Sequence, residues 1–114
     1  GGYCFLHMCK SGLNMKRYDE DYAALADVVN WGVYEAPMTL ADGKKQFPGK
    51  TILGGLENRS GVLVDGDEYD VRREVIKVVE NFGREGFILG ADCTLATEQD
   101  LKLVRAAVEQ ARSL

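Results

Sequence analysis

One histidine and two cysteines lie at the ends of apolar runs, where their side chains could bind a metal ion. His7 and Cys9 end the run over residues 3–9, and Cys93 ends a second run over residues 86–93. If the first run is a strand, His7 and Cys9 point to the same side, because residues two apart in a strand share a face. Two thiolates and one imidazole are a three-ligand set for zinc that leaves the fourth position open, as in catalytic zinc sites.

These three residues are widely separated along the chain. Cys9 and Cys93 are 84 positions apart, which does not match the compact spacing of a zinc finger or knuckle. Packed cysteines and a hydrogen-bonded histidine with no metal would give the same pattern. Only a fold that brings distant strand ends together could use all three residues at one metal ion.

The composition is that of an ordinary globular domain. The chain has 114 residues, of which 46% are hydrophobic and 28% charged, and its net charge is −4. The acidic balance argues against nucleic-acid binding, which normally requires a basic patch. No apolar run approaches the ~20 residues of a membrane span, and no signal peptide is visible. Three cysteines, an odd number, favour a reducing compartment, so we expect a cytoplasmic protein.

Apolar runs alternate with segments of helical character along the whole chain. Strands are expected over residues 3–9, 28–33, 50–56 and 86–93, and helices over residues 13–26, 38–47, 70–82 and from Thr97 onward. Residues 57–66, rich in Asn, Gly and Asp, are expected to form a loop. Thr97 and Asp100 resemble a capping box at the start of the last helix, with Asp in place of the usual Glu or Gln.

The alternation of strand and helix predicts an α/β fold with parallel strands joined by right-handed crossovers. Four units in 114 residues give about 28 residues each, close to the repeat of a (β/α)₈ barrel, which spreads roughly 250 residues over eight units. A four-stranded doubly wound sheet is the alternative, but neither a Gly-x-Gly-x-x-Gly motif nor a P-loop is present. Half of a barrel therefore fits the pattern better.

Four stretches together resemble one known family. Residues 7–9, 30–31, 47–56 and 86–93 occur in the order and rough spacing of the uroporphyrinogen decarboxylase superfamily. Within it, the chain is most similar to the branch of cobalamin-dependent and coenzyme M methyltransferases, in which a His-x-Cys and a distant Cys bind zinc. The resemblance implies that residues 1–114 are the C-terminal half, the last four β/α units, of a (β/α)₈ barrel. It also implies that His7, Cys9 and Cys93 are the zinc ligands.

The resemblance implies a function and partners as well. The chain would be a zinc-dependent methyltransferase, or a fragment of one, that moves a methyl group between a corrinoid carried by a partner protein and a small thiol. The first half of the barrel would come from another copy or from a separate chain, or the chain would be a fragment of a longer protein. The alternatives are a decarboxylase like the one that gives the superfamily its name, and a non-catalytic barrel fragment.

Four further residues are candidates for supporting roles. Asp92 precedes Cys93 and is expected either to orient His7 or the metal, or to be a solvated loop acid. Asn30 stands inside an apolar strand, where it would contact substrate or satisfy a neighbouring backbone group. Glu57 and Asn58 follow the third strand and are expected to line the mouth of the site.

Overall fold

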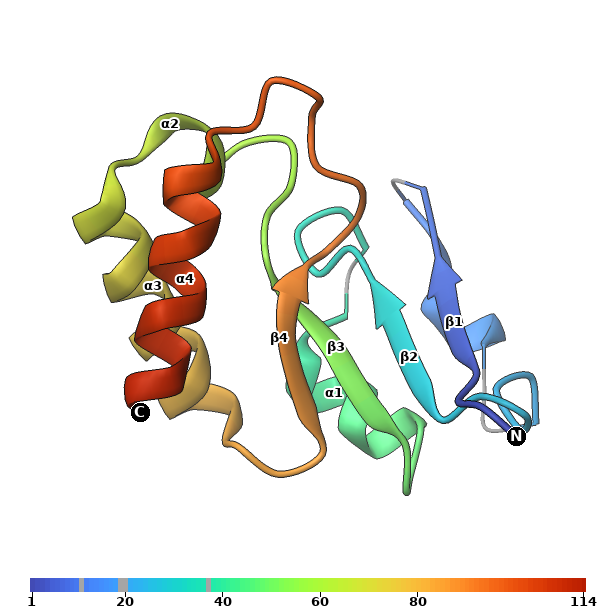
Figure 1. The fold of residues 1–114 in the computed structure, drawn as a ribbon. Coiled ribbons are helices and arrows are strands. Elements are labelled where there is room, and N and C mark those ends of the chain that lie inside the picture. The colour runs from blue at the N-terminus through green and yellow to red at the C-terminus, as the bar shows by residue number, and fades with distance from the viewer. Residues whose placement is uncertain (11, 19–20, 37) are drawn as a thin grey trace.

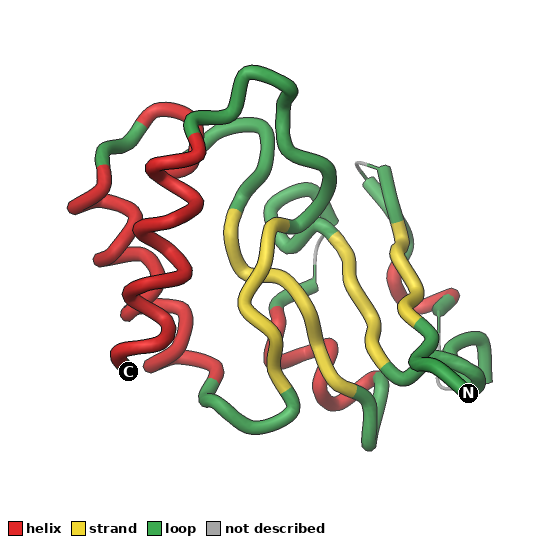
Figure 2. The backbone as a smooth tube through the Cα atoms, in the orientation of Figure 1, coloured by secondary structure: helices red, strands yellow, loops and turns green. Residues whose placement is uncertain are grey.

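Four parallel strands form one sheet in this protein, as a computed structural model that describes residues 1–10, 12–18, 21–36 and 38–114 shows (Figures 1 and 2). The elements follow one another as β1 (Phe5–Met8), η1 (Met15–Arg17), β2 (Val28–Trp31), α1 (Leu40–Gln46), β3 (Thr51–Leu56), α2 (Val62–Asp65), α3 (Glu68–Phe82), β4 (Phe87–Ala91) and α4 (Leu101–Ser113). The four predicted strands and the α/β class are confirmed.

The strands lie side by side in the order of the sequence, β1-β2-β3-β4, and every pair is parallel. Each connection therefore steps in the same direction across the sheet. Because crossovers of this kind are nearly always right-handed, successive steps in one direction place the helices on the same face. A doubly wound sheet would instead reverse direction at a switch point. The observed order is compatible with half of a β/α barrel.

One predicted helix is wrong. Residues 13–26, apart from the undescribed positions 19–20, form turns and the single 3₁₀ turn η1. The segment is held by contacts outside itself: the Gln46 side chain of α1 donates hydrogen bonds to the backbone oxygens of Met15 and Tyr18. Leu25, which a helix would bury, is 90% exposed. The segment covers the core with Met15, Ala23 and Ala26 without the regular apolar face that a helix needs.

Two smaller expectations also need correction. The loop expected over residues 57–66 contains the one-turn helix α2. Thr97 does not cap the last helix, because α4 begins at Leu101 and the carboxylate of Asp100 accepts the capping hydrogen bond from the Lys102 N–H. Capping boxes do occur at α1, between Thr39 and Asp42, and at α3, between Asp67 and Asp70.

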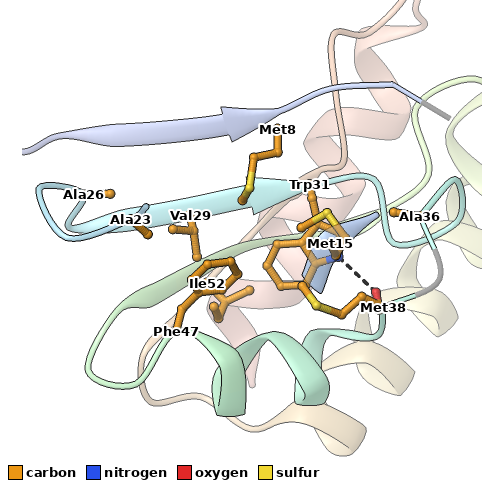
Figure 3. Packing of buried hydrophobic residues seen from close by; sticks show 10 residues of the cluster. All are labelled: Met8, Met15, Ala23, Ala26, Val29, Trp31, Ala36, Met38, Phe47 and Ile52. Atoms are coloured by element: carbon orange, nitrogen blue, oxygen red, sulfur yellow. Dashed lines mark hydrogen bonds between the residues drawn. The ribbon is translucent and has the colours of Figure 1, made fainter. Parts of the chain in front are cut away.

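The larger part of the core lies between the sheet and α1 (Figure 3). Trp31, Val29, Ile52 and Phe47 are fully buried there. The indole N–H of Trp31 donates a 2.9 Å hydrogen bond to the Met38 carbonyl, which satisfies the polar edge of an otherwise apolar ring. A second cluster joins α3 and α4 to β3 and β4, and these helices stand beside β4 in Figure 1.

The opposite face of the sheet is open. His7, Asn30, Leu53 and Ile88 form one row across the four strands, because each is the register partner of the next. None of the four is buried, and Ile88 is 40% exposed. Phe5, in the neighbouring row on the same face, is 59% exposed. A hollow of about 430 Å³ lies on this face near the strand starts, lined in part by Phe5, Val28 and Ile88. In a barrel this face would be the interior.

Candidate metal centre

His7, Cys9 and Cys93 lie together at the carboxyl edge of the sheet. His7 is in β1, Cys9 follows the end of that strand, and Cys93 stands two residues after the end of β4. Their side-chain donor atoms all lie within 4.8 Å of one another, and the two Sγ atoms are 3.5 Å apart. The three residues are therefore close enough to bind one metal ion, although they are far apart in the sequence.

This closeness is not a trivial result of the sheet, because β1 and β4 are its two outer strands. Three strand spacings in a flat sheet would separate them by about 14 Å. The chain that follows β4 instead bends across the strand ends toward β1 (Figure 1). This loop carries Cys93 to Cys9, so that the two Sγ atoms meet although they come from the two outer strands.

The two thiols differ in their surroundings, so their pKa values shift in opposite directions. The hydrogen bond with Cys93 is the main cause that raises the pKa of Cys9. Burial is the largest influence on Cys93 and acts to raise its pKa, but the Thr94 N–H, the hydrogen bond with Cys9 and the neighbouring His7 ring together outweigh it and the net shift is downward. Cys93 is therefore the thiol that ionises first, and the thiolate is the form that binds metal.

The donor set and its spacing fit zinc. Two sulfurs bound to one tetrahedral Zn²⁺ at ~2.3 Å lie about 3.8 Å apart, close to the Sγ–Sγ distance of 3.5 Å. Two soft thiolates with one imidazole select zinc over hard cations such as Mg²⁺ or Ca²⁺, which prefer oxygen ligands. His7 and Cys9 are exposed, so a ligand can reach the fourth position from solvent.

Asn30 contacts His7 directly. The two residues are register partners on β1 and β2, and the Oδ1 atom of Asn30 is hydrogen-bonded to Nδ1 of His7. The Nδ2 amide of Asn30 donates a 2.8 Å bond to the carbonyl of Leu53 on β3. From the sequence, Asn30 was expected either to contact substrate or to satisfy a neighbouring backbone group, and the bond to Leu53 is such a backbone contact. The contact with His7 was not expected.

Asp92 is buried directly beside the site, with 1% of its surface exposed. Its Oδ2 accepts a 3.0 Å bond from the Val33 N–H, and its Oδ1 accepts a 3.1 Å bond from the Gly55 N–H. Burial raises the pKa of Asp92 to about 6, although these backbone donors oppose the shift. The carboxylate thus ties the ends of β2, β3 and β4 together. The solvated alternative for Asp92 is wrong, while the hydrogen bond that orients His7 comes from Asn30.

Glu57 and Asn58 lie in the loop that follows β3. Asn58 is buried, with 5% exposure, and its Nδ2 donates a 3.0 Å bond to the Thr94 carbonyl. It therefore fixes the segment just after Cys93. Glu57 is half-buried and accepts a hydrogen bond from the Ser60 hydroxyl. The Asn58 amide and the Glu57 carboxylate thus both bind groups of the protein itself. Their expected role at the mouth of the site stays a prediction.

Sequence reasoning missed a charged pair near the thiols. Nε of Arg59 lies 3.6 Å from Oε1 of Glu35, and the two side chains act in opposite directions on the pKa of Cys9. Glu35 follows β2 and Arg59 follows β3, so no spacing in the sequence relates them. Only their positions after strand ends could have predicted that they lie near each other, because the loops after parallel strands meet at one edge of the sheet.

Comparisons with protein-family models, with curated protein sequences and with solved structures found no match for this chain. Among the described residues, no helix combines the length and the apolar character that crossing a bilayer requires. A proposed function therefore rests on the geometry of the site and on the motif resemblance described from the sequence.

Proposed function

We propose that this chain is the zinc-binding half of a (β/α)₈-barrel methyltransferase, in which His7, Cys9 and Cys93 hold the metal. The observation that supports it is the convergence of the three donors within 4.8 Å at the carboxyl edge of a parallel sheet. Barrel enzymes place their chemistry at this edge. The likeness to uroporphyrinogen decarboxylase-type methyltransferases adds the reaction: transfer of a methyl group between a corrinoid and a small thiol.

The donor set suits this chemistry. Zinc with one open position would keep a bound substrate thiol deprotonated at neutral pH, since coordination removes the thiol proton. The two cysteine thiolates and the neutral imidazole donate electron density, so the substrate sulfur stays nucleophilic. The lowered pKa of Cys93 prepares one ligand for binding before the metal arrives. His7, Cys9 and Cys93 would hold the zinc, which would supply a deprotonated thiol able to accept the methyl group from the corrinoid of the partner protein.

The proposal requires partners. A corrinoid protein would deliver the methyl group in the cytoplasm, and four more β/α units would close the barrel. The open face and the free edges of the sheet support this second requirement, because parallel sheets are normally covered on both faces. Another copy of this chain or a chain carrying the first half of the barrel would supply the missing units.

Elemental analysis of purified protein tests the metal site. We expect about one zinc ion per chain in the wild type and a loss of most of it in Cys9→Ser and Cys93→Ser, because hydroxyl oxygen replaces a thiolate ligand. Cys4→Ser is the matched control, since Cys4 is exposed and lies outside the donor group. It should keep the zinc content of the wild type.

Equal zinc in all four proteins, or none in any, would contradict the proposal. A chain without metal would instead favour a non-catalytic barrel fragment. For a chain that does bind zinc, demethylation of free methylcobalamin in the presence of a small thiol tests the reaction on the assembled barrel. The signal should depend on Cys9 and Cys93 and should not depend on Cys4.

A further inference from the structure

The single histidine of this chain is held by an amide on the neighbouring strand. His7 and Asn30 face one another across β1 and β2 as register partners on the open side of the sheet. Nδ1 of His7 and Oδ1 of Asn30 form the hydrogen bond between them. A neutral imidazole carries one ring proton, so whichever nitrogen holds it decides which nitrogen is left to bind a metal.

The orientation of the Asn30 amide is determined by a third strand. Its Nδ2 donates to the Leu53 carbonyl at 2.8 Å. If the amide were turned around, Oδ1 would face the Leu53 carbonyl oxygen and two acceptors would oppose each other without a proton between them. The end of Asn30 that faces His7 is therefore the oxygen. An oxygen that accepts requires that Nδ1 of His7 be the protonated nitrogen.

We propose that Asn30 is a positioning residue for the metal site: it holds neutral His7 with the proton on Nδ1 and leaves the lone pair of Nε2 free to bind the metal held by the two thiols. This inference rests on the proposed function for the metal itself, but the ring proton can be measured without metal. Metal-bound histidines commonly donate their other ring N–H to a protein acceptor, which fixes the ring and raises its basicity.

The same arrangement explains a polar residue within apolar strands. Asn30 is flanked by Val29 and Trp31, which are fully buried on the helix side of the sheet. The amide links β1, on which His7 lies, to the backbone of β3 through the two ends of one side chain. A carboxylate could serve His7 but would meet the Leu53 carbonyl without a proton, and an aliphatic side chain could serve neither group.

The ring proton can be located by long-range ¹H–¹⁵N NMR of the metal-free protein at about pH 8, where a free imidazole is neutral. Because the chain has one histidine, the spectrum contains a single pair of ring nitrogens and needs no assignment. We expect the Nδ1–H form in the wild type and a shift toward the Nε2–H form in Asn30→Ala. Asn30→Asp retains an acceptor and should keep the Nδ1–H form.

Gln99→Ala is the matched control. Like Asn30, Gln99 has a half-buried side-chain amide, and its Nε2 donates a 2.7 Å hydrogen bond to the backbone carbonyl of Leu63. It differs from Asn30 in lying beside α4, outside the donor group. The variant should lose stability, as Asn30→Ala should, yet leave the ring proton where it is. An Nε2–H form in the wild type, or identical spectra for wild type and Asn30→Ala, would overturn the proposal.

Competition between the protein and a chromophoric chelator for Zn²⁺ gives the second readout. We expect Asn30→Ala to bind zinc ~10–100-fold more weakly than the wild type, the usual range for loss of such a partner, and Gln99→Ala to bind it as the wild type does. Equal affinities for wild type and Asn30→Ala would overturn the positioning role. If the wild type bound no zinc at all, the proposed function would fail, while the NMR result would still decide whether Asn30 sets the proton on His7.

Discussion

Two adjacent residues of the site, Asp92 and Cys93, have very different surroundings. Cys93 is half-buried and contacts Cys9, whereas Asp92 is 1% exposed and binds backbone N–H groups at the ends of two other strands. Cys93 thus presents a thiol to the site, while the residue before it anchors the edge of the sheet. The anchor matters because the loop must carry Cys93 across that edge.

Replacing Asp92 by Ala should therefore destabilise the fold. The Val33 and Gly55 N–H groups would lose their acceptor in a buried place, and we expect the free energy of unfolding to fall by about 3 kcal/mol. Urea unfolding followed by circular dichroism measures the loss. Asp65→Ala is the control, since Asp65 is exposed, and an equal loss in both variants would argue against the anchoring role.

The sequence was sufficient to select the three donors but not their supporting residues. His7, Cys9 and Cys93 are recognisable because their types are rare here and each follows an apolar run. The contact of His7 with Asn30 depends on the register of β1 against β2, and register is not encoded in either strand alone. The partners of Asp92 are backbone groups, which have no residue type to recognise.

At the scale of elements, α1 packs on the sheet through a single glycine. A Cβ atom added to Gly43 would lie 1.9 Å from the Cη2 atom of Trp31, so the buried indole fills the space where a side chain would begin. Gly43 is in the middle of a helix, where alanine would normally be preferred by about 1 kcal/mol. At position 43, the close approach of α1 to β2 therefore outweighs the lower helix propensity of glycine.

Gly43→Ala should lower the free energy of unfolding by about 2 kcal/mol, because overpacking outweighs the gain in helix propensity. Trp31→Phe shortens the ring that occupies this space, so Gly43→Ala should cost little when made in the Trp31→Phe background. A double-mutant cycle from urea unfolding measures this coupling. Additive losses from the two substitutions would contradict the packing described for Trp31.

A hydrogen bond joins the loop after β2 to α3. The Tyr34 hydroxyl donates to Oε1 of Glu74 at 3.3 Å, and burial together with the charge of Glu74 raises the pKa of Tyr34 to about 12. The neutral phenol is thus favoured in the folded state. The stability that it contributes is complete below the ordinary tyrosine pKa of about 10 and is lost as the pH rises from about 10 to about 12.

Ultraviolet absorbance titration of the folded protein should therefore show one late tyrosinate component near pH 12. Tyr34→Phe should remove this component, and Tyr69→Phe, a substitution at an exposed tyrosine, should leave it in place. The stability difference between wild type and Tyr34→Phe should shrink above about pH 10. A late component that survives in Tyr34→Phe would show that the link to Glu74 is not its cause.

Elements with a strong local signal were predictable from the sequence, and the others were not. β3 and β4 are apolar runs that each begin shortly after a glycine, and α3 has buried Val71, Val75 and Val78 at helical spacing. Residues 13–26 lack such a period, and their conformation is set by the Gln46 side chain of α1. Contacts that come from a distant element leave no periodicity in the segment that receives them.

For the molecule as a whole, coverage of the sheet is one-sided. The helices cover the face that contains Val29, Trp31 and Ile52, while Phe5 and Ile88 remain 59% and 40% exposed on the other face. β1 and β4 are outer strands, each with one strand partner within the part of the chain that the structure describes. Exposed strand edges and an apolar face both favour association with a further sheet.

We therefore expect the purified chain to form a species larger than a monomer in size-exclusion chromatography with light scattering. Ile88→Asp places a charge on the open face and should shift the species toward the monomer, since burying an unpaired carboxylate is costly. Leu101→Asp is the matched control, because Leu101 is 76% exposed on α4, away from this face. It should leave the assembly unchanged.

The same fractions should be analysed for zinc, because the donor residues lie at the rim of the open face. His7 is in the same row as Ile88, and a second set of β/α units would surround the site that His7 helps to form. Zinc enriched in the assembled fraction would link closure of the barrel to formation of the site. A stable wild-type monomer that keeps its fold and its zinc would contradict the half-barrel interpretation, while leaving the three-donor site intact.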